Sequence, residues 1–170
     1  DAVWEQTQAF HAERGLALPD RADRPNVRSV LYPYIEAYRM AGQEVVLEEA
    51  AEVGIVMILS IQVNPQYFQS EIRHAVDRLL GNGPGGFFAP GRLRFGEDLW
   101  ASDLYQLLMG QSGIDNICLN RFKRLGDRFQ DQAGSGRIVL EGLETAICDN
   151  DQARPERGYY TLVLHGGRKG

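Results

Sequence analysis

The clearest pattern in the sequence lies between residues 53 and 63. Every odd-numbered position of this stretch is apolar, whereas the even-numbered positions begin with Val56 and Ile58 and end with Ser60 and Gln62. Successive side chains of a β-strand point to opposite faces of the sheet. The pattern therefore predicts an interior strand whose sheet is covered mainly on one side.

A helix is expected directly after this strand. Asn64 is a good N-cap residue, and Pro65 suits the first helical position. Apolar side chains then recur on one helical face, at Phe68, Ile72, Ala75, Val76 and Leu79. Gly81 is typical of a helix end.

Weaker patterns complete the expected fold. Helical spacing is found over residues 27–40, where Pro33 would kink the helix or delay its start, and from Ser102 to Gly110. Strands are expected at residues 44–48, 114–122, 138–140 and 159–164. In the strand at 114–122, strict alternation places Phe122 on the face opposite Ile117 and Leu119. This order predicts an α+β fold, a small mixed sheet with helices packed mainly on one face.

The first 26 residues are expected to form an arm and a linker. Residues 1–15 have a weak amphipathic pattern with Trp4 and Phe10, and Pro19 and Pro25 follow among alternating charges. The predicted α+β domain spans residues 27–170.

Composition narrows the classes of function. The chain has 170 residues, of which 44% are hydrophobic, and its formal net charge is −5. This charge disfavours nucleic acid as the main partner. Two cysteines exclude a disulfide scaffold and fit a reducing compartment. No apolar run approaches about 20 residues, so direct membrane insertion is not expected. The chain begins with Asp1 and has no signal-peptide pattern, which suggests a piece of a longer protein.

One loop is a candidate cation site. Asp149, Asp151 and Glu156 offer carboxylate oxygens of the kind that Ca²⁺ binds. The loop lacks the glycine and the distant glutamate of a calcium loop, so a turn stabilised by Asx side chains is the alternative. These residues carry the second hypothesis, a metal- or ligand-binding hydrolase domain.

A basic and aromatic stretch is the other notable feature. Arg121, Lys123, Arg124 and Arg128 alternate with Phe122 and Phe129. In an acidic chain this pattern favours a salt-bridged surface or a protein interface. No combination of nucleophile, base and orienting group is evident, and no cofactor motif is present, so neither an enzyme nor a cofactor is expected.

Several sequence blocks together resemble a known family. They are residues 36–42 (EAYRMAG), 63–68 (VNPQYF), 86–90 (GFFAP), 95–99 (FGEDL), 102–105 (SDLY), 112–117 (SGIDNI), 122–126 (FKRLG), 136–140 (GRIVL), 149–151 (DND), 155–156 (PE) and 166–168 (GGR). In this order, residues 25–168 resemble the C-terminal part of the baseplate J-like assembly proteins of phage tails and extracellular contractile injection systems.

The resemblance implies a non-enzymatic structural subunit of a baseplate wedge. Such a subunit would contact other wedge proteins, hub proteins and sheath-initiating proteins, and would self-associate around a ring. It would be assembled in the bacterial cytoplasm, in a phage tail-like particle that can be released. An adaptor or effector domain that rides on the particle is a third hypothesis. The candidate interface residues are Trp4, Phe10, Phe87, Phe88, Arg121, Phe122, Arg124 and Phe129. For each of them, packing within its own domain is the alternative.

Overall fold

The computed structural model describes residues 2–15 and 27–169, except for the side chains at positions 2–4, 6, 7, 29 and 30. The chain divides into two compact units, residues 1–49 and residues 50–170. The sequence placed the boundary after residue 26, whereas the structure groups the helix that begins at Val27 with the first unit.

The first unit contains two helices, α1 (Ala2–Arg14) and α2 (Val27–Tyr38). They meet through aromatic rings: the ring of Phe10 lies 4.9 Å from that of Tyr34 and 5.9 Å from that of Tyr38. The guanidinium of Arg14 lies 4.0 Å above the Phe10 ring. Helix α2 begins at Val27 and continues through Pro33, so the proline does not delay its start.

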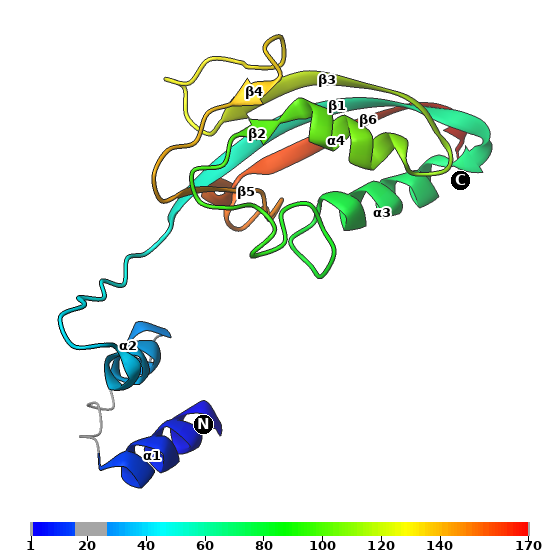
Figure 1. The fold of residues 1–170 in the computed structure, drawn as a ribbon. Helices are drawn as coiled ribbons and strands as arrows, with labels where there is room; N and C mark the ends of the chain where they lie inside the picture. Colours follow the sequence, from blue (N-terminus) through cyan, green and yellow to red (C-terminus); the bar gives the residue numbers. More distant parts are fainter. Residues whose placement is uncertain (1, 16–26, 170) are drawn as a thin grey trace. The chain divides into compact units, whose positions relative to one another are not determined.

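The second unit is built around one long strand, β1 (Ala51–Phe68), as Figure 1 shows. The other elements are α3 (Gln69–Leu80), β2 (Leu99–Trp100), α4 (Ala101–Met109), β3 (Ile114–Arg124), β4 (Arg137–Ile138), β5 (Glu144–Ile147), the 3₁₀ helix η1 (Pro155–Arg157) and β6 (Tyr159–Arg168). Strand β1 pairs antiparallel with β3 and parallel with both β5 and β6. A separate antiparallel pair joins β2 to β4.

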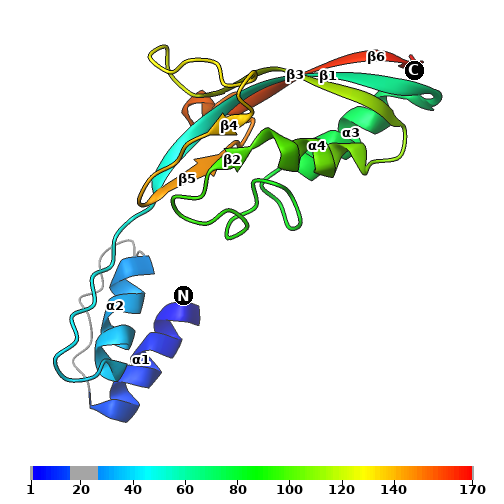
Figure 2. The ribbon, with the colours of Figure 1, turned by 45° about the horizontal axis from the view of Figure 1, so that its top comes forward.

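Helices α3 and α4 lie on the same face of this mixed sheet (Figure 2). The odd-numbered residues of β1 from Ile55 to Val63 face them and are at most 1% exposed. Ile72 and Val76 of α3 and Leu104 of α4 pack into the same core. The predicted α+β class and the predicted interior strand are confirmed. No helix in the described part of the chain is long and apolar enough to cross a membrane.

The helix predicted to start at Asn64 and Pro65 begins later. Strand β1 continues to Phe68, and α3 starts at Gln69. The amide of Asn64 donates to the carbonyl of Gly113 (2.9 Å), which holds this segment extended. The backbone amide of Phe68 instead donates to the side chain of Glu71 (3.3 Å) and so caps the helix.

Two strand predictions were also wrong in detail. Residues 44–48 are β-prone in sequence, but no described strand pairs with them. In β3, the register shifts at Asn120: Ile58 pairs with Arg121, but Leu59 pairs with Leu119. This bulge reverses the alternation. Phe122 therefore joins the core face instead of the opposite one.

Candidate functional site

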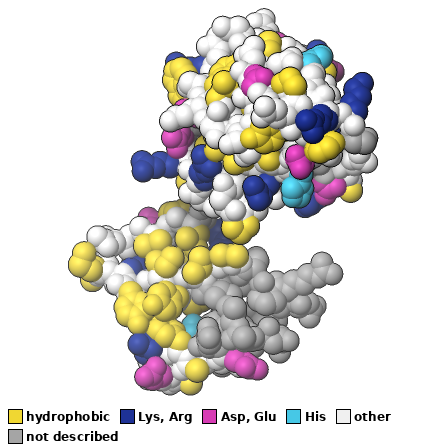
Figure 3. Space-filling view, turned by 90° about the vertical axis from the view of Figure 1, so that its right-hand side faces the viewer, with side chains coloured by type: hydrophobic (Ala, Val, Ile, Leu, Met, Phe, Trp, Pro, Cys, Tyr) yellow, Lys and Arg dark blue, Asp and Glu magenta, His cyan; other side chains and the backbone are white. Residues whose placement is uncertain are grey.

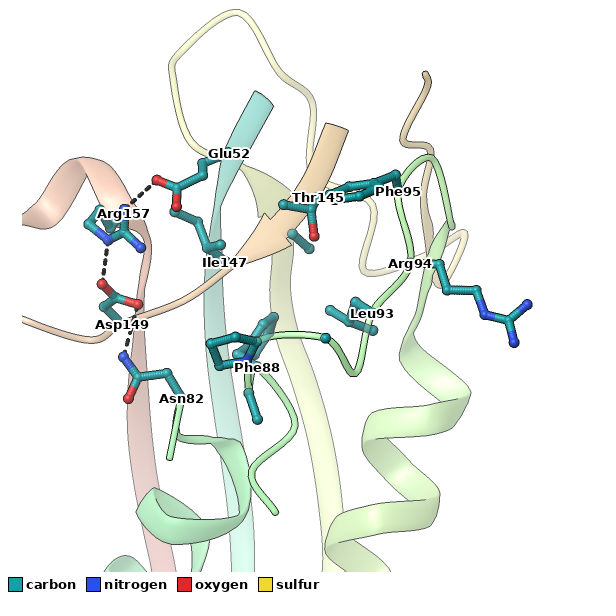
Figure 4. A pocket seen from close by; sticks show the side chains of 14 residues that line it. Glu52, Asn82, Phe88, Leu93, Arg94, Phe95, Thr145, Ile147, Asp149 and Arg157 are labelled. Carbon is teal, nitrogen blue, oxygen red and sulfur yellow. Dashed lines mark hydrogen bonds and ion pairs between the residues drawn. The ribbon is translucent and has the colours of Figure 1, made fainter. Parts of the chain in front are cut away.

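A pocket of about 530 Å³ opens in the second unit beside β5 (Figure 4). Apolar side chains such as Phe88, Leu93 and Ile147 line part of it, and charged groups line one rim. Its lining residues come from β1, β5, the loop after α3 and the loop that contains η1; they are Glu52, Asn82, Phe88, Ala89, Pro90, Gly91, Leu93, Arg94, Phe95, Thr145, Ala146, Ile147, Asp149 and Arg157.

The charged rim is an ion-paired network. The guanidinium of Arg157 donates hydrogen bonds to the carboxylates of Asp149 and Glu52, and the side-chain amide of Asn82 donates to Asp149 across 3.1 Å. Burial acts to raise the pKa of Asp149, but the hydrogen bonds from Arg157 and Asn82 outweigh it and lower that pKa. Each charge on this rim thus has a partner, and the network fastens the η1 loop to β1 and to the end of α3.

In the candidate cation loop, acidic side chains also pair with arginine. Asp151 accepts hydrogen bonds from the Ala153 amide (2.9 Å) and from Nε of Arg154 (3.2 Å). The first of these is the Asx turn that the sequence offered as the alternative. Among the described residues, no three His, Cys, Asp or Glu side chains are grouped so that they could hold a metal ion. Asp149, Asp151 and Glu156 therefore do not converge as metal ligands.

Three candidate interface residues belong to the core. Phe87 and Phe88 are 2% and 5% exposed, and their rings meet edge to face at 5.1 Å. The amide of Phe87 donates to the carbonyl of Leu79 (2.7 Å), which draws the loop onto α3. Phe122 is fully buried. In this fold none of the three presents its ring to a partner, so their prediction as interface residues was wrong.

Other candidates remain at the surface. Arg121 is exposed, and the half-buried ring of Phe129 lies between two guanidinium groups, 4.8 Å from that of Arg124 and 4.7 Å from that of Arg128. Arg124 also forms an ion pair with Glu144 of β5. This ion pair agrees with one of the two alternatives that the sequence left open, a salt-bridged surface, and the protein interface stays a prediction. Of the two arm residues, Phe10 is half-buried against α2, and the side chain of Trp4 lies outside the described part.

The outer margin of β3 is closed by side chains. Three of the amides that face away from β1 have side-chain acceptors: Ile117 donates to Asn116 (2.9 Å), Leu119 to the hydroxyl of Tyr105 (3.1 Å) and Phe122 to Asp131 (2.9 Å). Such capping removes the free donors through which an edge strand recruits another strand.

On the molecular surface, charges of both signs are interspersed with small apolar patches over the second unit (Figure 3). No broad basic field of the kind that binds nucleic acid is visible on this face. The pocket was missed in the sequence because the charged residues of its rim network, Glu52, Asp149 and Arg157, come together only through the pairing of β1 with β5 and β6. Comparisons of the chain with models of protein families, with curated proteins and with solved structures find no match.

Proposed function

We propose that this chain is part of a non-enzymatic structural subunit of the baseplate wedge of a contractile, phage tail-like injection particle. The particle would be assembled in the bacterial cytoplasm, and the subunit would contact neighbouring wedge, hub and sheath-initiating proteins. Two features support this proposal: the way the resembling blocks join in the fold, and an exposed apolar stripe on α2.

Blocks that are far apart in sequence contact one another. Asn64 of the VNPQYF block donates to Asp115 of the SGIDNI block across 3.1 Å. Arg137 of the GRIVL block donates to Asp98 of the FGEDL block across 2.7 Å, and Asp98 also accepts from the amide of Leu140 (3.1 Å). The blocks therefore hold the fold together. This is what we expect if the resemblance reflects a shared scaffold rather than a shared reaction centre.

The observation that carries the proposal is the stripe on α2. Val27, Leu31, Tyr34 and Tyr38 recur at the spacing of one helical face, and they are 73%, 43%, 49% and 56% exposed. The ring of Phe10 contacts the tyrosine end of this stripe. A stripe of large exposed apolar side chains is typical of a surface that another protein covers. We assign that role to a neighbouring baseplate protein.

The test uses the protein that contains this chain, expressed with the particle's other genes. Leu31→Asp puts a charge on the stripe, and we expect fewer intact particles by electron microscopy and by sedimentation. Tyr32→Asp is the matched control, because Tyr32 is also 43% exposed but lies off the stripe; particle yield should stay at the wild-type level. Circular dichroism of both variants verifies that the helices are retained.

Two outcomes would favour the other hypotheses. Intact particles that still assemble after deletion of residues 27–170 would replace the scaffold role with that of a passenger or adaptor. Calcium or manganese that raises the melting temperature of the purified chain would indicate a metal-binding domain, because a ligand of the native state stabilises it by mass action.

A further inference from the structure

The other margin of the sheet differs from that of β3. Strand β6 pairs with β1 and, among the described strands, with no other (Figure 2). Its even-numbered residues direct their backbone groups away from β1. At the start of the strand, the amide of Tyr160 donates to the side chain of Asn150 (3.1 Å). At the far end, the side chain of Gln69 donates to the carbonyl of Gly166 (2.6 Å).

Between these two caps lies a window of free backbone groups. Because alternate residues of a strand face the same margin, Leu162 and Leu164 also face outward. No described group bonds to their amides and carbonyls. The window thus offers two donors and two acceptors in strand geometry, which is the pattern that a further β-strand satisfies.

We propose that this window binds the same strand of a second copy of the chain, antiparallel, about a two-fold axis at Val163. In this register Leu162 of each copy lies opposite Leu164 of the other. The two residues exchange both of their hydrogen bonds, so four bonds form without displacing Asn150 or Gln69. The number of bonds matches the free groups of the window.

Side-chain size agrees with this register. Val163 lies opposite its own copy on the uncovered face, where it is 38% exposed, and Thr161 lies opposite His165. Tyr160 lies nearest to Gly166, where two consecutive glycines with positive φ end the regular strand. No bulky ring is therefore set against another, and Val163 meets an equally small β-branched residue.

Charge agrees as well. Between Gly158 and Gly167 the strand has no Asp, Glu, Lys or Arg, so no like charges are opposed along the shared window. The window itself therefore adds no charge repulsion that a second copy would have to overcome.

Disulfide trapping tests the register in the full 170-residue chain. All variants contain Cys118→Ser, because Cys118 is exposed and could form cross-links of its own. Directly opposed residues that are not hydrogen-bonded to each other have Cα atoms about 4.5 Å apart, within the range that a disulfide bridges. We expect Val163→Cys to form a disulfide-linked dimer on oxidation, whereas Thr161→Cys, which would lie opposite His165, should not link to itself.

A charge exchange tests the interface in solution. By analytical ultracentrifugation we expect a concentration-dependent dimer for the wild-type chain. Val163→Lys and Val163→Glu should each shift the dimer dissociation constant at least about tenfold toward monomer, and an equimolar mixture of the two variants should restore dimers. Val139→Lys is the control, because Val139 is 47% exposed and lies outside β6.

A wild-type chain that stays monomeric, or a dimer that tolerates both charges at Val163, would overturn this inference. This two-fold contact is separate from the ring association expected of the proposed subunit, and the two can fail separately. Loss of particles in the Leu31→Asp variant does not depend on β6, and the β6 dimer can be measured without any particle.

Discussion

The hydroxyl of Tyr160 donates a hydrogen bond to the carboxylate of Asp77 across 2.8 Å, and so joins β6 to α3. Tyr160 is 8% exposed, and burial together with Asp77 raises the pKa of its phenol, which therefore stays protonated as the donor. Because Asp77 is exposed, water can replace the lost bond in Tyr160→Phe. We expect a loss of about 1 kcal/mol in the free energy of unfolding, measured with urea. Tyr159→Phe, at an exposed tyrosine one residue earlier, should change it by less than about 0.5 kcal/mol.

Gly86 is needed for the turn that carries Phe87 and Phe88 into the core. A Cβ at Gly86 would lie 1.9 Å from the carbonyl oxygen of Gly81, which is backbone and cannot rotate away. We expect Gly86→Ala to lower the free energy of unfolding by at least about 2 kcal/mol. Gly83 in the same loop has nothing within 4 Å of such a Cβ, so Gly83→Ala should be neutral. Equal effects of the two changes in a denaturant titration would contradict this role.

The network at the pocket rim predicts a pH dependence of stability. The pKa of Asp149 is lower in the folded chain than in the unfolded one, so the ionised carboxylate stabilises the fold above about pH 4, and this contribution is lost as the pH falls through the folded pKa. At pH 7 we expect Asp149→Asn to be less stable by about 1.5–3 kcal/mol. The difference from wild type should shrink toward pH 3 in thermal melts.

Asp127→Asn serves as the control for this measurement. Asp127 is exposed in the loop after β3, and its loss should leave the acid dependence unchanged. If Asp149→Asn followed the same pH curve as the wild-type chain, the paired rim would not contribute to acid stability.

The two cysteines should differ in reactivity. Cys118 is exposed on β3, whereas Cys148 is 1% exposed, and burial followed by the nearby charge of Asp149 raises its pKa to about 12. Only a thiolate is a good nucleophile. At pH 8 we expect one iodoacetamide adduct per native chain and two in urea, counted by mass spectrometry. Native Cys118→Ser should gain none.

Local patterns predicted the parts of the fold that one segment determines alone. The alternation across residues 53–63 predicted an interior strand because burial on one face repeats every second residue. The helix start predicted at Asn64 and Pro65 was wrong, because the distant carbonyl of Gly113 accepts a hydrogen bond from the Asn64 amide and keeps the strand extended. The face of the sheet on which Phe122 lies depends on a bulge in β3, which only the pairing with β1 reveals.

The candidate site was less accessible to sequence reasoning. The charged residues of the η1 loop were visible in the sequence. The ion pair of Arg157 with Glu52 was not, because these two residues meet only when β1 pairs with its parallel neighbours. Residues 44–48 show the reverse case: their composition favours a strand, but a strand also needs an adjacent edge, and none is provided within the described residues. The propensity to form a strand is a property of one segment, whereas strand pairing depends on the rest of the chain.

The caps on β3 limit how far association through strands can proceed. Asn116, Tyr105 and Asp131 occupy the amides that a third chain would need. When two copies join through their β6 strands, the window of each covers the window of the other, so neither copy has a β6 window left for a third. Association by this route terminates at two molecules and cannot grow into a fibre, even when many copies are crowded together.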